Sequence, residues 1–234
     1  MGSLSKINTI PTYTTKLISN IKEQVTYRPY TSGEQKKLLV AKLEDDQEQI
    51  YHALDQLIKD CTNGKVSIYT HPSFDIEFLM ILMRMKAAGE IVNAGLKCGG
   101  CQKDFPITID LNKITVTDNR VDNRIKIGEG LYVVMKYPTI ISASKFSVDN
   151  VNSVFEEVAR CIECIVNGDE VFDCTGKPVE EVVEFLDSLF DSQLEKIKEF
   201  FDRSPTITYK NVYECPHCQH MNEVEMRGAS YFFQ

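Results

Sequence analysis

The sequence carries two Cys-x-x-Cys turns, Cys98-Gly99-Gly100-Cys101 and Cys215-Pro216-His217-Cys218. Glycine and proline favour a tight turn between the two thiols, in which backbone N–H groups can point at sulfur. Strand-like sequence adjoins each turn, as it does in zinc ribbons. Two such turns supply four thiolates, the donor set of a closed, tetrahedral structural zinc site. We therefore predict that Cys98, Cys101, Cys215 and Cys218 bind one structural Zn²⁺.

The two turns are far apart in sequence, since the first ends at Cys101 and the second begins at Cys215. Closing a loop of roughly 110 residues costs about 4 kcal/mol, because the closure entropy grows with the logarithm of loop length. Structural zinc contributes an apparent ~10–16 kcal/mol in small peptides. The metal is therefore expected to hold together two distant parts of the chain.

Two other interpretations of the turns stay open. A site of four cysteines would leave His217 facing solvent, and a mixed Cys–His site that involves His220 is the second choice. Cys-Pro-His-Cys also matches the active site of a strong thiol oxidant of the thioredoxin class, in which the motif opens a long helix. Here the sequence ends at Gln234, soon after Cys218, and residues 221–226 resemble a strand. Redox catalysis is therefore the weaker hypothesis.

The other four cysteines are a pair three residues apart and two isolated thiols. Cys161-Ile162-Glu163-Cys164 lies in a predicted helix, where residues three apart share a face and could bind metal. Buried thiols in a core stripe are more common, and we favour that interpretation. Cys61 and Cys174 are interpreted as lone free thiols.

Composition places the chain among soluble globular proteins, since its 234 residues are 43% hydrophobic and 26% charged. The longest apolar run, residues 78–83, is much shorter than the roughly twenty residues that a membrane span needs. With 26 basic and 34 acidic side chains, the net charge is -8. Such a charge disfavours nucleic-acid binding unless it is sharply segregated. Residues 1–6 precede no apolar secretion signal, so we expect a reducing cytosol.

Hydrophobic spacing predicts an α+β protein with a helical body, a small antiparallel β region and a discontinuous, zinc-ribbon-like site of four cysteines. We expect a single domain over residues 1–234. Its helical parts are predicted at 31–92 and 149–204, and its β and zinc-binding part at 96–137 and 205–228.

Several element boundaries follow from local signals. Thr31 and Glu34 have the spacing of a capping box. An apolar stripe from Leu39 to Cys61 predicts one long helix that opens at this capping box and ends near Asn63-Gly64. Helical spacing predicts another helix over 151–166. A further helix is expected from Pro178 to 205, with a break at Asp191. Strand composition is found at residues 10–17, 25–30, 105–111, 114–117, 124–127, 131–137, 206–213 and 224–226.

No set of catalytic residues is recognisable in the sequence. The chain has four histidines and lacks a Gly-x-Ser-x-Gly motif, a phosphate-binding loop and a Gly-x-Gly-x-x-Gly motif. We therefore expect a protein that is not an enzyme and that acts by binding.

Short motifs follow one another along the chain in a defined order. They are Arg28-Pro29-Tyr30, Glu34-Gln35-Lys36, the first Cys-x-x-Cys, Phe105, Ile109-Asp110-Leu111, Tyr137-Pro138-Thr139, Asn167-Gly168-Asp169-Glu170, Phe185-Leu186-Asp187-Ser188-Leu189, Phe200-Phe201, Tyr213-Glu214-Cys215-Pro216-His217-Cys218, Gly228 and Phe232-Phe233. From about Ile10 to the end, this ordered series resembles the baseplate hub assembly and hub subunit proteins of T4-type phages.

The resemblance implies a role in building the phage baseplate hub, either as an assembly factor or as a hub component. The implied partners are hub and tape-measure proteins, toward which the chain could act as a chaperone. The implied location is the host cytoplasm during assembly, with the virion tail baseplate as a second location. The alternatives from other classes are a zinc-ribbon nucleic-acid module and, less favoured, a thiol oxidoreductase.

Overall fold

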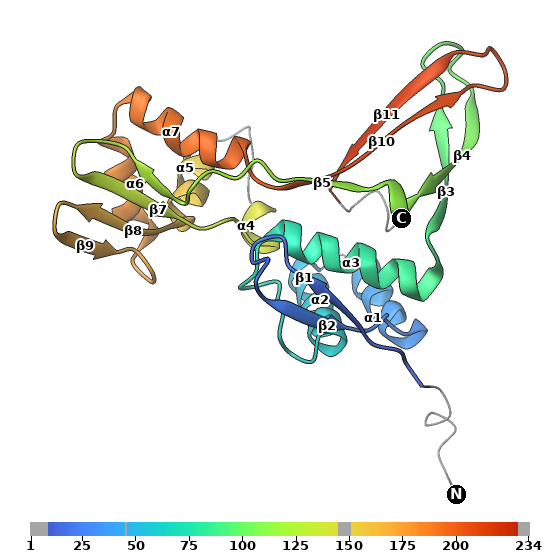
Figure 1. Cartoon of the computed structure of the whole chain (residues 1–234), viewed down its shortest axis with the longest axis horizontal. Coiled ribbons are helices and arrows are strands. Elements are labelled where there is room, and N and C mark those ends of the chain that lie inside the picture. The colour runs from blue at the N-terminus through green and yellow to red at the C-terminus, as the bar shows by residue number, and fades with distance from the viewer. Residues whose placement is uncertain (1–8, 45, 145–150, 229–234) are drawn as a thin grey trace, which may run out of the picture. The chain divides into compact units, whose positions relative to one another are not determined.

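A computed structural model describes residues 9–44, 46–144 and 151–228 (Figure 1). Helices and small antiparallel sheets follow one another along this part of the chain, which confirms the predicted α+β class. The chain divides into two compact units: unit 1 is Met1–Thr117 with Thr206–Gln234, and unit 2 is Asp118–Pro205. Whether both units unfold together, as a single domain would, stays a prediction. The Phe232-Phe233 pair lies outside the described residues.

The helices of unit 1, among its described residues, are α1 (Ser32–Leu43), α2 (Gln47–Cys61) and α3 (Ser73–Ala88). The prediction of one long helix from the capping box to Asn63-Gly64 is wrong, because two helices, α1 and α2, cover this stretch. Asp46 starts a new helix, because its carboxylate accepts hydrogen bonds from the first backbone N–H groups of α2, at 3.0 and 3.3 Å. The helix-capping hydrogen bonds of Asp46 thus separate two helices where the apolar spacing alone predicts one.

A short hairpin, β1 (Tyr13–Lys16) with β2 (Gln24–Tyr27), is joined to these helices by polar contacts. The backbone N–H of Arg28 donates to the carbonyl of Cys61, at 2.9 Å. The Arg28 guanidinium donates two hydrogen bonds to the Glu34 carboxylate, at 2.6 and 3.0 Å. Glu34 also completes the predicted capping box with Thr31, which is thereby confirmed.

We expect Glu34→Gln to remove a pH-dependent part of the stability. The Arg28 hydrogen bond is the main cause that lowers the pKa of Glu34 to about 2 from 4.5. A carboxylate with a lowered folded pKa stabilises the protein above its ordinary pKa, and this contribution is lost as pH falls through the folded value. The urea midpoint of the wild type should exceed that of the variant at neutral pH and converge on it between pH 4.5 and about 2.

The matched control for this prediction is Glu223→Gln, which changes an exposed carboxylate on the strand Met221–Arg227. The role assigned to the Arg28–Glu34 pair would be contradicted if the difference in urea midpoint between the wild type and Glu34→Gln stayed constant as the pH falls.

Two longer hairpins complete unit 1. The first joins β3 (Ile91–Lys97) to β4 (Asp104–Asp110), and the second joins β10 (Thr206–Glu214) to β11 (Met221–Arg227). Strand β5 (Thr115–Thr117) pairs with the start of β10, so that Thr117 lies opposite Thr206. A single 3-10 turn, Leu111–Lys113, lies between β4 and β5.

Strand β3 replaces the end of the predicted helical part, residues 31–92, and precedes the predicted start of the β part at 96. Gly89, with a φ of 88°, follows the last residue of α3, and the strand begins two residues later. Its side chains alternate between exposed and half-buried, with Val92, Ala94 and Leu96 on the half-buried face. Asn93 and Gly95 are weak strand formers, which explains why composition did not reveal this strand.

Unit 2 is built on an antiparallel sheet of four strands in chain order: β6 (Arg124–Lys126), β7 (Leu131–Met135), β8 (Ile162–Asn167) and β9 (Glu170–Asp173). Its helices are α4 (Ile140–Ala143), α5 (Val151–Arg160), α6 (Val179–Asp187) and α7 (Asp191–Asp202), so the predicted break at Asp191 is confirmed. Strands β6 and β7 thus belong to this sheet and not to the hairpins that carry the predicted zinc ligands.

The prediction of a helix over residues 151–166 is wrong beyond Arg160. The chain turns at Cys161 and continues as β8, because the β-branched residues of 162–166 pair with β7. The turn from β8 to β9 has Gly168 at φ 61°, a conformation that glycine adopts without strain.

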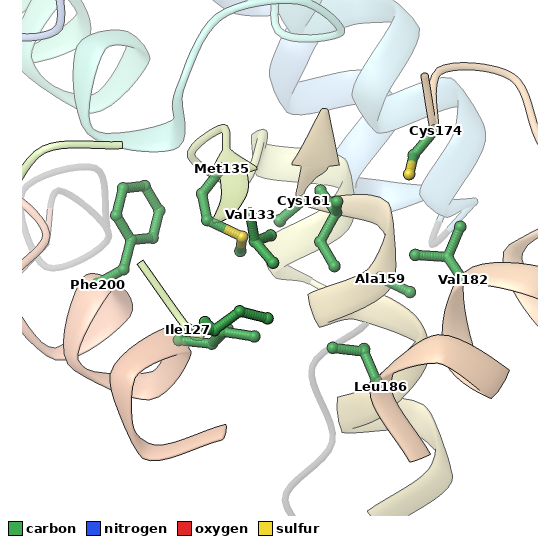
Figure 2. Packing of buried hydrophobic residues seen from close by; sticks show 11 residues of the cluster. Ile127, Val133, Met135, Ala159, Cys161, Cys174, Val182, Leu186 and Phe200 are labelled. Atoms are coloured by element: carbon green, nitrogen blue, oxygen red, sulfur yellow. The ribbon is translucent and has the colours of Figure 1, made fainter. Parts of the chain in front are cut away.

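The core of unit 2 lies between the sheet and its helices (Figure 2). Val133, Ile162, Leu186 and Phe200 are fully or almost fully buried, and the ring of Tyr137 stacks on that of Phe200 with centroids 4.5 Å apart. Figure 2 also shows Cys161 among these apolar side chains, which confirms it as a core thiol. Burial raises the pKa of Cys161 to about 12, so this thiol stays protonated.

The net charge is distributed unevenly between the units. Residues 118–205 carry 18 acidic and 10 basic side chains and thereby account for the whole net charge of -8. The remaining residues are balanced in charge, so neither unit is basic. Among the helices of the described residues, none is long and apolar enough to cross a membrane.

Candidate metal centre

Each of the two long hairpins of unit 1 carries one Cys-x-x-Cys turn at its tip, and the two tips have the same backbone geometry. In the first, the Cys98 N–H donates to the carbonyl of Lys103, at 3.0 Å; in the second, the Cys215 N–H donates to the carbonyl of His220, at 2.9 Å. The residue four positions after the first cysteine is a glutamine with positive φ in both, 62° at Gln102 and 60° at Gln219.

The four sulfur atoms of the two tips converge. Cys98 Sγ lies 3.6 Å from Cys218 Sγ, and Cys101 Sγ lies 3.7 Å from Cys215 Sγ. All four lie within 4.8 Å of one another. The thiols are free, since a disulfide requires about 2.05 Å. The structure therefore brings together all four residues that the sequence singled out, although the two pairs are far apart along the chain.

The spacing of the sulfurs fits the predicted metal. Four sulfurs at about 2.3 Å from a tetrahedral zinc ion are about 3.8 Å apart, close to the two shortest separations found here. The donor set also fits, because thiolates are the preferred ligands of structural zinc. Cys98 and Cys215 are fully buried and Cys218 is exposed, so the cluster lies at the surface with one side covered by the hairpins.

Backbone N–H groups favour the thiolate form at Cys98. Those of Cys101 and Gly100 are the main donors, with the Gly100 N–H 3.3 Å from Cys98 Sγ, and the pKa of Cys98 falls to about 6. A thiolate is the form in which cysteine binds metal.

The histidines near the cluster are not part of the convergent group. His217 and His220 are both exposed, and the ligand atoms within 4.8 Å of one another are four sulfurs. His220 instead covers the first turn. A Cβ added to Gly100 would lie 3.0 Å from His220 Cγ, so this position requires a glycine or a shift of the imidazole.

Asn222 is a residue of this site that sequence reasoning missed. Its side chain is buried, accepts a hydrogen bond from the Gly99 N–H at 2.8 Å, and donates to the carbonyls of Tyr213 and His220 at 3.2 and 3.0 Å. Its amide also lies 3.8 Å from Cys98 Sγ. Asn222 thus joins the two turns without binding metal. The available signal was a polar residue at the inward position of strand β11.

Tyr213 makes a second connection between the hairpins. Its hydroxyl donates to the Thr108 carbonyl, at 2.8 Å, and contacts the hydroxyl of Tyr209, at 2.7 Å. The hairpins are therefore fixed to each other by hydrogen bonds as well as by their tips.

We expect Asn222→Ala to destabilise unit 1 by about 1–3 kcal/mol, because the Gly99 N–H and two carbonyls lose a buried partner. Asn93→Ala, which changes an exposed strand residue in the other hairpin, should alter stability by less than about 0.5 kcal/mol. Urea unfolding of both variants measures the difference, and equal midpoints would show that Asn222 does not join the turns.

The fold and the cluster together define an α+β protein in which two hairpins, far apart in sequence, meet at four cysteines. The chain matches the family described as T4 bacteriophage base plate protein over residues 10–234. Because that match covers nearly the whole chain, the protein belongs to this family, and the resemblance to T4-type baseplate proteins is confirmed. Neither the curated proteins nor the solved structures contain a match.

Proposed function

We propose that this protein is a non-enzymatic component or assembly factor of the phage baseplate hub. The observation that carries the proposal is membership of the T4 base plate family over residues 10–234. Baseplate proteins work by contact with one another, so the family itself implies other baseplate proteins as partners. The proposal adds that these partners are hub and tape-measure proteins, which the chain binds as a chaperone during assembly in the host cytoplasm.

The four-thiol cluster supports a structural metal within that function. Cys98, Cys101, Cys215 and Cys218 would hold a zinc ion, which would fix the tips of the two hairpins to each other. A site closed by four thiolates leaves no position for water or substrate, in contrast to catalytic zinc sites. The zinc-ribbon-like arrangement is thus proposed as a scaffold for binding.

The rival functions find less support. Neither unit carries net positive charge, whereas a nucleic-acid-binding module needs a basic surface. In thioredoxin-like oxidants the Cys-x-x-Cys motif opens a long helix. Here Cys218 leads into strand β11, and four thiols converge where such enzymes use two.

The test is purification of the tagged full-length chain from phage-infected cells, with its partners identified by mass spectrometry. We expect hub or tape-measure proteins to co-purify, and untagged infected cells provide the control. Recovery of the chain without any baseplate protein would contradict the proposal. Mass spectrometry of purified virions then distinguishes a hub component, present in the particle, from an assembly factor, absent from it.

A further inference from the structure

Unit 2 contains an apolar groove of about 660 Å³, well away in sequence from the thiol cluster. Helix α5 contributes Val154, Phe155 and Val158, and helix α7 contributes Leu194 and Phe201. All five side chains are half-buried, so solvent reaches them. The buried side chains of Leu186 and Ile197 belong both to the groove lining and to the core of the unit. The lining is therefore fixed by packing and is available before any partner arrives.

The shape of the groove suits a helix better than an extended peptide. Helices α5 and α7 use their backbone groups internally, so they offer no ladder of hydrogen bonds to an added strand. The lining residues of α7 recur at helical spacing, from Leu194 through Ile197 and Lys198 to Phe201. Ridges at that spacing accept the side chains of another helix, whose own backbone is already satisfied. Helix α7 has 12 residues and is roughly 18 Å long, enough to contact about three turns of a partner.

The rim of the groove is acidic. Asp191, Glu195 and Lys198 lie in its lining, and Glu195 also lines a second hollow of about 400 Å³ together with Lys196, Glu199 and Asp202. Lys198 forms an ion pair with Glu195, at 3.3 Å, and Arg203 forms one with Glu199, at 3.1 Å, so these two carboxylates are partly neutralised and the acidic character is a net one. The segment from Val179 to Asp202 carries eight acidic and two basic side chains. An apolar floor beside an acidic rim favours a partner that has an apolar face next to basic side chains.

We propose that this groove binds an amphipathic helix of another baseplate protein, with apolar residues at positions i, i+3, i+4 and i+7 and with lysine or arginine along one flank. The apolar face would fill the space between α5 and α7, while the basic flank would lie along the acidic side of α7. The identity of the partner as a baseplate protein rests on the proposed function; the chemistry of the helix rests on the groove alone.

The direct test uses the full-length protein and a synthetic leucine–lysine amphipathic helical peptide, with binding followed by fluorescence anisotropy. We expect the peptide to bind, to bind more weakly as salt is added, and to protect α5 and α7 from hydrogen exchange. The double variant Glu195→Lys/Glu199→Lys changes exposed side chains and should weaken binding roughly tenfold at low salt. The control Glu163→Lys/Glu170→Lys, with the same charge change on exposed positions of β8 and β9, should stay within about twofold.

Equal weakening in both double variants would overturn the proposal, because it would show attraction to the overall charge of unit 2. Protection that leaves α5 and α7 unaffected and appears elsewhere would overturn it as well. So would concentration-dependent self-association that protects the groove while the peptide fails to bind, because the occupant would then be a second copy of the chain.

The same variants separate this inference from the proposed function. If hub proteins co-purify equally with the wild type and with Glu195→Lys/Glu199→Lys, the proposed function stands and the groove is not their binding site. If the peptide binds in the groove but no baseplate protein co-purifies from infected cells, the groove is a binding site for an amphipathic helix, while the proposed function and the identity of the partner as a baseplate protein both fail.

Discussion

Replacing Cys98 or Cys215 by serine is expected to release the metal and to lower the stability of unit 1 by more than about 4 kcal/mol, beyond the range of most single substitutions. Both thiols are fully buried, and each lies within 3.7 Å of a thiol from the other hairpin. A hydroxyl at either position is a poor zinc ligand, and the three remaining thiolates would repel one another. Elemental analysis should give one zinc per wild-type chain and almost none in the variants, and thermal unfolding reports the loss of stability.

The matched control is Cys174→Ser. The Cys174 thiol lies 3.7 Å from the Phe172 carbonyl and outside the four-thiol cluster, and a serine hydroxyl can donate to the same carbonyl. This variant should keep its zinc and nearly all of its stability. The metal proposal would be contradicted if the wild-type protein, purified under reducing conditions, held no zinc. It would also be contradicted if the Cys98→Ser variant retained the ion.

Phe200→Ala is expected to destabilise unit 2 by about 3–5 kcal/mol, the usual cost of removing a buried phenylalanine. The ring is fully buried, stacks on Tyr137 and makes an edge contact with Phe201, 5.4 Å between centroids. Phe190→Ala, where the ring is 76% exposed, should have little effect. Urea unfolding compares the two variants. A small loss in Phe200→Ala, similar to that in Phe190→Ala, would mean that the core in Figure 2 does not carry the stability of the unit.

Hydrogen exchange on Phe200→Ala also tests whether the chain is a single domain. If unit 1 keeps its protection while unit 2 loses it, the two units unfold separately. If protection falls equally in both, the predicted single domain is the better description.

The sequence revealed the four thiols because their signal is local: each pair, with its turn-forming residues, occupies four consecutive positions. It could not reveal which long-range contacts accompany them. Asn222 is chemically ordinary in sequence, and only the approach of Gly99 from the other hairpin gives its amide a role. The same limit applies to the apolar groove, which exists only because α5 and α7 lie together.

The missed strands have a different origin. Cys161-Ile162-Glu163-Cys164-Ile165-Val166 places apolar residues at spacings that fit a helix, yet β-branched side chains favour a strand when a partner strand is present. Pairing with β7 decided between these two outcomes. Asp46 shows the reverse case, because its carboxylate caps a new helix locally, within an apolar stripe whose spacing alone predicts one continuous helix.

The pairing of Thr117 with Thr206 makes unit 2 an insertion whose two ends leave and re-enter the host fold side by side. Most of the chain between Cys101 and Cys215 belongs to that insertion. Only the segments 102–117 and 206–214 connect the two thiol pairs to the paired residues Thr117 and Thr206. Bringing the tips together then closes a loop of roughly 25 residues instead of roughly 110, at a cost of about 3 kcal/mol instead of about 4 kcal/mol. We therefore expect that unit 2 can be replaced by a short turn between Thr117 and Thr206. Unit 1 would then keep its strand pairings and its four clustered cysteines.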